Sequence, residues 1–177
     1  MAGFPDVTSF GDFSDIADYE NIRSKISGFV NGLLSKHRPD VVITIERKGR
    51  RLFMDLVDCR FLEGTLIRTD SDFLQSDIIG RKVLIFDDSM HTAKSVILAI
   101  DGMGPARPDN LIVSAILSNG TARANLVSRG VAPENIEVFE SFDDYESQQQ
   151  RYSEKMFTLL NGVRNKLGTS YIHRLLH

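Results

Sequence analysis

One stretch, residues 82–98, restricts the folds open to this 177-residue chain more than any other. It begins with an unbroken apolar run, Val83–Phe86, that leads directly into two adjacent acids, Asp87 and Asp88. A short polar turn follows, and the apolar residues then recur at helical spacing as far as Met103. An apolar run without alternation is typical of a strand buried on both faces of a parallel sheet. Acids at the carboxyl end of such a strand lie where open α/β sheets bind ligands.

Strand and helix patterns alternate through the rest of the chain. Further strands are expected at 41–45, 59–68, 111–117 and 136–139, and helices from Ile16 to just before Pro39, then at 52–57, 121–129 and 145–167. Such alternation indicates a parallel α/β sheet. We therefore expect an α/β fold with a single domain over residues 1–177, in which a central, mostly parallel sheet is flanked by helices. Residues 1–15 are expected to form a loosely ordered arm, and 145–177 a helical segment.

Composition narrows the functional classes. The net charge of −3 gives no argument for a nucleic-acid or membrane partner. No apolar run approaches the ~20 residues of a membrane helix, and the N-terminus lacks the pattern of a signal peptide. The single cysteine, Cys59, rules out an internal disulfide framework and is expected to be a small buried residue. These features favour a cytoplasmic protein and leave a homodimer open.

A basic segment follows the first of these strands, at 46–51. Its residues are Glu46, Arg47, Lys48, Gly49, Arg50 and Arg51. Cations at a helix start are disfavoured by the helix dipole by about 0.3–1 kcal/mol each. A bound anion would offset this cost, since the free N–H groups there also attract anions, and Gly49 lets the backbone approach one closely. A solvated basic loop is the alternative, and the residues alone give both interpretations equal weight.

The acid pair and the turn behind it form a second polar segment. Asp87 and Asp88 could bind a divalent metal, serve as acid and base, or accept hydrogen bonds from a sugar diol. Neighbouring strand residues point to opposite faces, so both acids can face one ligand only where the strand breaks into the loop. The turn offers hydroxyls, a small residue and a cation, which suit a phosphate; it comprises Ser89, Met90, His91, Thr92, Ala93, Lys94 and Ser95. One of Ser89, Thr92 and Ser95 is expected to cap the helix; in the alternative, the turn does only this and the acids are solvated.

Residues 84–95 resemble the phosphoribosyl-pyrophosphate signature of type I phosphoribosyltransferases, which is an apolar run, two acids, two apolar or small residues and a phosphate loop. The order of elements over roughly residues 20–140 is also similar, and 43–49 stand where the family has its pyrophosphate loop. The resemblance implies that Asp87 and Asp88 hold the ribose hydroxyls. It places the 5′-phosphate at 89–95 and the pyrophosphate at 46–51. Magnesium would be held chiefly by the ligand, and the implied reaction transfers a phosphoribosyl group to or from a nucleobase-like acceptor.

Three departures from the family pattern keep a second hypothesis open. The phosphate loop reads His91-Thr92-Ala93 where the family usually has Thr-Thr-Gly, and Lys94 adds a charge. The stretch 69–77, where the family keeps its mobile catalytic loop, contains no Lys or Arg, and no base-binding hood is recognisable. These departures favour a non-catalytic module that senses a phosphoribose or nucleotide, so the sequence does not decide whether the chain is an enzyme. A third hypothesis is an assembly component that uses its C-terminal helix as an interface.

Two other α/β families match less well. Residues 83–89 also resemble the first strand of response-regulator receiver domains. However, no later strand ends in an isolated Asp that is followed by a Thr/Ser strand and a Lys. Haloacid-dehalogenase phosphatases require Asp-x-Asp at the strand end, which Asp87-Asp88-Ser89 does not provide.

Overall fold

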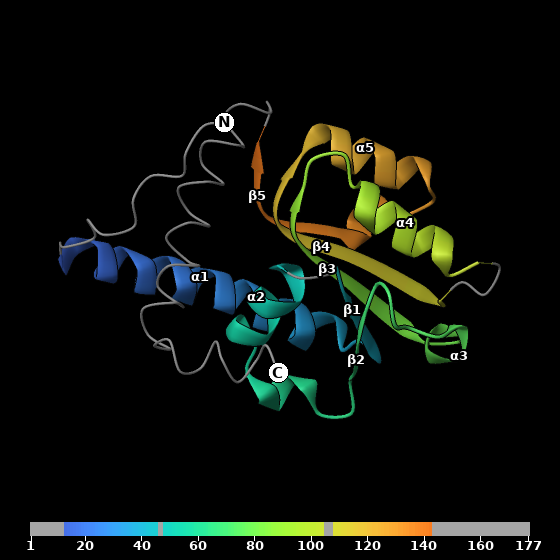
Figure 1. Ribbon diagram of the computed structural model, residues 1–177, viewed down its shortest axis with the longest axis horizontal. Coiled ribbons are helices and arrows are strands. Elements are labelled where there is room, and N and C mark those ends of the chain that lie inside the picture. The colour runs from blue at the N-terminus through green and yellow to red at the C-terminus, as the bar shows by residue number, and fades with distance from the viewer. Residues whose placement is uncertain (1–12, 46–47, 105–107, 143–177) are drawn as a thin grey trace.

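Five parallel strands form the centre of the molecule (Figure 1). The computed structural model describes residues 13–45, 48–104 and 108–142. The strands are β1 (Val41–Thr44), β2 (Leu66–Thr69), β3 (Lys82–Met90), β4 (Asn110–Asn119) and β5 (Ile136–Phe142). They lie in the order β2-β1-β3-β4-β5, and each neighbouring pair is parallel. The predicted α/β fold with a parallel sheet is confirmed.

Helices cover both faces of the sheet, α1 and α2 on one side and α4 and α5 on the other (Figure 1). They are α1 (Phe13–His37), α2 (Lys48–Leu56), α3 (Gln75–Ile78), α4 (Lys94–Gly102) and α5 (Gly120–Ser128), with short 3-10 helices η1 (Cys59–Leu62) and η2 (Pro133–Asn135). Strand β3 shows why its sequence does not alternate. Leu84 and Phe86 pack in the cluster with α1 and α2, whereas Val83 and Ile85 pack in the cluster with α4. All four side chains are fully buried.

The expected strand at 59–68 is wrong in its first half. That half forms η1, because the Asp58 side chain accepts a hydrogen bond from the Arg60 N–H at 3.0 Å and caps a short helix. Gly64, with φ of +78°, then turns the chain into β2. The position of Cys59 is a second correction, since on this surface helix the residue is exposed rather than buried.

Several boundaries also move. Helix α1 begins at Phe13, so residues 13–15 are helical rather than part of an arm. The rest of that arm and the expected segment at 145–177 lie outside the described residues. Strands β4 and β5 each run further toward their carboxyl ends than expected. In the described part of the chain, no helix is long and apolar enough to cross a bilayer.

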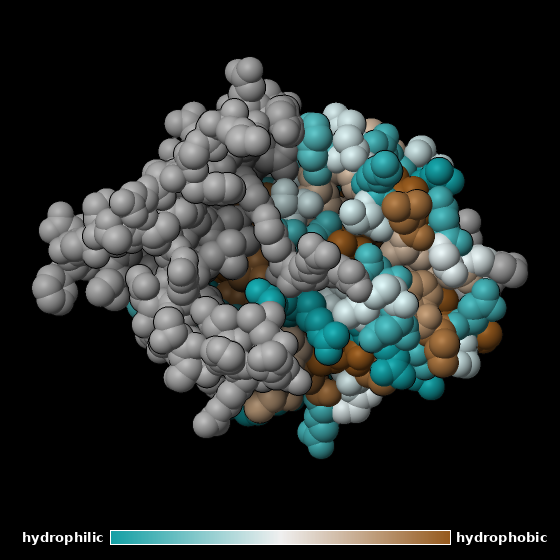
Figure 2. Space-filling view, in the orientation of Figure 1, coloured by the Kyte–Doolittle hydropathy of each residue, from teal (hydrophilic) through white to brown (hydrophobic). Residues whose placement is uncertain are grey.

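The coloured part of the surface in Figure 2 mixes polar and apolar areas rather than showing one continuous apolar face. Large apolar side chains that stay exposed include Leu74, Ile79 and Leu98. Single exposed apolar residues are normal on a protein surface and do not by themselves mark a docking site.

Candidate functional site

The predicted polar segments meet at the carboxyl edge of the sheet. Because the strands are parallel, β1, β3 and β4 all end at this edge. Strand β3 carries the acid pair there, α2 begins just after β1, and α4 begins just after β3. Ligands of open α/β sheets bind at this edge.

The acid pair lies on the strand itself rather than in the loop behind it. The polar turn expected from Ser89 begins later, because β4 continues beside β3: Asp87 pairs with Ala115 and Met90 with Ser118. Asp87 is 7% exposed and Asp88 8% exposed. The Asp88 N–H donates to Asp87 Oδ1 at 2.8 Å. The alternative in which the acids are simply solvated is therefore excluded.

Burial changes the protonation of the pair. It raises the pKa of Asp87 to about 8, and the hydrogen-bonded and negatively charged Asp88 side chain adds to the rise. The two adjacent backbone N–H groups of Asp88 and Ser89 oppose it only in part. The raised pKa favours a protonated carboxyl group in the pair, which has an O–H donor as well as acceptor oxygens.

The basic segment reaches the acid pair through the first turn of α2. This helix begins at Lys48, so Lys48–Arg51 belong to it and do not form a loop before it. A Cβ atom on Gly49 would lie 3.5 Å from the Phe86 carbonyl oxygen and 3.7 Å from Asp87 Oδ1. The start of α2 therefore lies beside the acid end of β3, with room for little more than a methyl group between them.

Arg50 and Arg51 are exposed. Glu46, Arg47 and the side chain of Lys48 lie outside the described part of the chain. The Thr69 N–H, which donates to Asp72 Oδ1, holds the pKa of Asp72 below its usual value, and the charge of Arg50 lowers it further.

The turn after β3 enters α4 through an alanine. Ala93 is the N-cap of α4, with φ of 55° and ψ of 23°, and no side chain caps the helix. The expectation that Ser89, Thr92 or Ser95 caps it is wrong for this reason. Ala93 is buried, whereas His91, Thr92, Lys94 and Ser95 are exposed. The N–H groups of the first turn of α4 therefore face the carboxyl edge without a side-chain cap, as an anion-binding helix start requires.

Sequence reasoning missed two asparagines of the β4–α5 corner. Asn119 Nδ2 lies 2.6 Å from His91 Nδ1, and Asn125 Nδ2 donates to the Thr92 carbonyl oxygen at 3.0 Å. Asn119 also caps α5, since its Oδ1 accepts from the Ala122 N–H at 2.9 Å. Asn at a strand-to-helix junction is a recognisable N-cap signal, so the cap could have been found from the sequence. Its contact with His91 could not.

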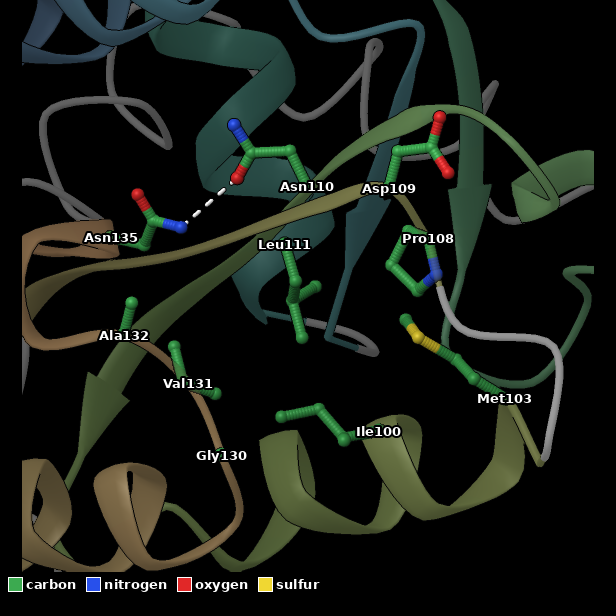
Figure 3. A pocket seen from close by; sticks show the side chains of 10 residues that line it. All are labelled: Ile100, Met103, Pro108, Asp109, Asn110, Leu111, Gly130, Val131, Ala132 and Asn135. Atoms are coloured by element: carbon green, nitrogen blue, oxygen red, sulfur yellow. Dashed lines mark hydrogen bonds between the residues drawn. The ribbon is translucent and has the colours of Figure 1, made fainter.

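A cavity of about 210 Å³ lies elsewhere, at the opposite edge of the sheet (Figure 3). It is lined by the start of β4, the last part of α4 and the loop after α5, and Figure 3 shows Ile100, Leu111 and Val131 around it. At one side of it, Asn135 Nδ2 donates to Asn110 Oδ1 at 3.0 Å. No predicted site residue lines this cavity, so the two places are separate.

The acid pair is too small a donor set to hold a metal ion without help. Among the described residues, no group of three or more His, Cys, Asp or Glu side chains could do so. Magnesium usually combines one or two carboxylates with phosphate oxygens of its substrate and with water. The pair fits an ion that a phosphorylated ligand brings with it.

Comparison with solved structures finds similarity to phosphoribosyltransferases. The hypoxanthine phosphoribosyltransferase of Trypanosoma cruzi superposes with a TM-score of 0.50 at 19% identity, over 71% of this chain and 79% of that one. A purine phosphoribosyltransferase from Pyrococcus horikoshii gives 0.49 at 14% identity, over 75% and 86% of the two chains. The orotate phosphoribosyltransferase of Mycobacterium tuberculosis gives 0.48 at 13% identity, over 72% and 96%.

Sequence comparison adds nothing to the structural match. No protein-family model matches the chain, and no curated protein matches it in sequence. The similarity at this level of identity concerns the fold. The chain has a type I phosphoribosyltransferase-like fold, as its signature residues predict.

Proposed function

We propose that the chain binds phosphoribosyl pyrophosphate, or a nucleotide with the same 5′-phosphoribose, and transfers the phosphoribosyl group to or from a nucleobase-like acceptor. The observation that carries this proposal is that the start of α2 lies beside the acid pair, so that a Cβ atom on Gly49 would come within 3.7 Å of Asp87 Oδ1. It joins the start of a basic helix to an acid pair at one sheet edge. A ligand with a pyrophosphate beside a ribose diol requires such a combination.

Each part of the ligand has a counterpart. Although Asp87 and Asp88 are neighbours on a strand, their side chains are hydrogen-bonded to each other. The diol hydroxyls would meet this pair, which together can donate and accept hydrogen bonds. The 5′-phosphate would lie against the first turn of α4, where Lys94 adds a positive charge and the backbone N–H groups have no side-chain cap. The pyrophosphate would lie at the start of α2 near Arg50 and Arg51. Catalysis would then consist of positioning and of stabilising the charge of the leaving pyrophosphate.

Magnesium would be bound through the phosphate oxygens of the ligand, with Asp87 or Asp88 as the protein's contribution. When bound, the ion would neutralise charge on the pyrophosphate as it leaves. The protein's own part is to hold the diol and to keep the acid pair buried beneath it.

A second candidate function, ligand sensing without transfer, is favoured by the β2–β3 connection. Arg68 Nε is paired with Asp77 Oδ2 at 2.9 Å, and the Thr69 N–H donates to Asp72 Oδ1 at 2.5 Å. The connection then forms α3, and it contains no Lys or Arg between residues 69 and 80. It therefore supplies no cation to a leaving pyrophosphate.

Titration calorimetry with phosphoribosyl pyrophosphate, with and without magnesium, tests binding. We expect wild-type binding that magnesium strengthens, and a loss of at least about tenfold in the Asp87→Asn/Asp88→Asn double variant (about 1.4 kcal/mol or more). Asp109→Asn is the matched control, because this exposed acid lies at the opposite edge of the sheet. Absence of wild-type binding, or equal binding by the double variant, would overturn the proposal.

Pyrophosphate release then separates the two functions. Wild-type protein with phosphoribosyl pyrophosphate, magnesium and a panel of purine and pyrimidine bases should release pyrophosphate if the chain is a transferase. Tight binding with no release over the whole panel would support the sensing function instead.

A further inference from the structure

Two amide side chains of the β4–α5 corner hold the turn that follows β3. Asn119, 5% exposed, contacts the imidazole of His91, and Asn125 donates to the carbonyl oxygen of Thr92. His91 and Thr92 are the two residues before the left-handed Ala93. The corner therefore contacts the turn through both a side chain, that of His91, and the backbone, at Thr92.

The orientation of the Asn119 amide follows from its second bond. Its Oδ1 accepts from the Ala122 N–H at 2.9 Å, and Ala122 is fully buried. The nitrogen Nδ2 is then the atom that faces His91 Nδ1, at 2.6 Å. An amide nitrogen only donates, so Nδ1 must accept, and the neutral ring carries its proton on Nε2.

We propose that Asn119 is a positioning residue that holds His91 in the tautomer protonated at Nε2. The imidazole then acts as an N–H donor at the carboxyl edge, for an anionic oxygen of the ligand's phosphate group. The ligand part of this inference rests on the proposed function. The tautomer does not, because the Asn119 contact from which it is inferred lies within the protein.

Two substitutions of Asn119 separate its cap from its contact with His91. Asn119→Ser keeps a side-chain oxygen to cap α5 but has no N–H group for the ring. Asn119→Asp also keeps the cap and offers a second oxygen, which accepts from a ring N–H instead of donating to the ring. In Asn119→Ser, the His91 ring should become a mixture of its two neutral tautomers. In Asn119→Asp, the ring should carry a proton on Nδ1.

Nitrogen-15 spectra of the histidine rings, recorded at pH 8 without ligand, measure the tautomer directly. The His91 signals are assigned by their loss in His91→Gln. We expect a bare Nδ1 and a protonated Nε2 in the wild type, a mixture in Asn119→Ser and a protonated Nδ1 in Asn119→Asp. A protonated Nδ1 in the wild type, or the wild-type pattern in Asn119→Asp, would overturn the inference. Circular dichroism on each variant confirms that it is folded.

Calorimetry with ribose 5-phosphate and with inorganic phosphate tests the ligand part. We expect both Asn119 variants to bind ribose 5-phosphate about tenfold more weakly than the wild type. Asn135→Ser, at the opposite edge of the sheet, should bind as the wild type does. Equal binding by wild type and Asn119→Ser would overturn the role of Asn119 toward the ligand and leave the proposed function standing. Absence of wild-type binding would overturn the proposed function. The nitrogen-15 spectra, recorded without ligand, would still test the tautomer.

Discussion

Gly49 lies beside Asp87, so that a Cβ atom on the glycine would lie 3.7 Å from the carboxyl Oδ1 of the acid. The first turn of α2 and the acid end of β3 thus form one unit, although 38 residues separate these two positions in the sequence. A substitution at Gly49 therefore changes the surroundings of the acid pair while both acids are kept.

Gly49→Ala should separate stability from binding. The new methyl group has ordinary van der Waals contacts, and Ala favours a helix over Gly, so the free energy of unfolding should stay equal or rise by up to about 1 kcal/mol. The same methyl group covers Asp87 Oδ1, so affinity for phosphoribosyl pyrophosphate should fall about tenfold. Chemical denaturation and calorimetry measure the two effects.

Gly28→Ala is the matched control for this prediction. Gly28 lies within α1, and a Cβ there would meet nothing within 4 Å. It should gain similar stability with unchanged affinity. Reduced affinity in Gly28→Ala to the same degree would contradict the role assigned to Gly49.

The protonation of Asp87 predicts how stability depends on pH. Its pKa is about 8 in the folded protein and near 4 in the unfolded chain, so the folded state binds more protons between these values. Stability should therefore fall as pH rises from about 5 to 8, with a contribution from this residue of up to about 1.4 kcal/mol per pH unit. Asp87→Asn should flatten the slope and be more stable than the wild type at pH 8. Urea unfolding at pH 5, 6.5 and 8 measures it, and identical slopes would contradict it.

The left-handed conformation of Ala93 predicts an unusual response to glycine. An L-residue in this region costs roughly 1–2 kcal/mol, and glycine does not incur that cost. Ala93→Gly should therefore raise the free energy of unfolding by about 0.5–1 kcal/mol. Ala99→Gly is the control, because this equally buried alanine lies within α4 and should lower it by about 1 kcal/mol. Losses of equal size in the two variants would show that Ala93 is not strained.

The centre of β4 contains a buried hydroxyl that the structure leaves unsatisfied. In the described part of the chain, Ser114 is fully buried and its Oγ has no hydrogen-bond partner. Ser114→Ala should raise the free energy of unfolding by about 1 kcal/mol, because it removes the desolvation cost of this group. Ser118→Ala removes a hydroxyl that donates to the Asn119 carbonyl oxygen at 3.3 Å and should not stabilise. Destabilisation by Ser114→Ala in thermal unfolding would contradict the prediction.

The patterns that predicted the fold are local. The apolar run at Val83–Phe86 could belong to a strand covered on both faces, and the helices on each side of the sheet cover it in this way. The boundaries were less accurate where a backbone or side-chain partner decides them. Strand β3 extends past the acids because β4 continues beside it, and η1 forms because Asp58 caps it.

By itself, the sequence determined that a doubly covered parallel strand carries two acids near its carboxyl end, and that a basic segment starts a helix at the same sheet edge. Only the tertiary structure decided the chemical state of these groups. The pKa of Asp87 is raised because the fold buries it beside Asp88, and His91 is contacted by Asn119, 28 residues further along the chain. Apolar periodicity is visible in neighbouring residues, whereas burial and hydrogen bonding depend on partners that only the folded chain brings together.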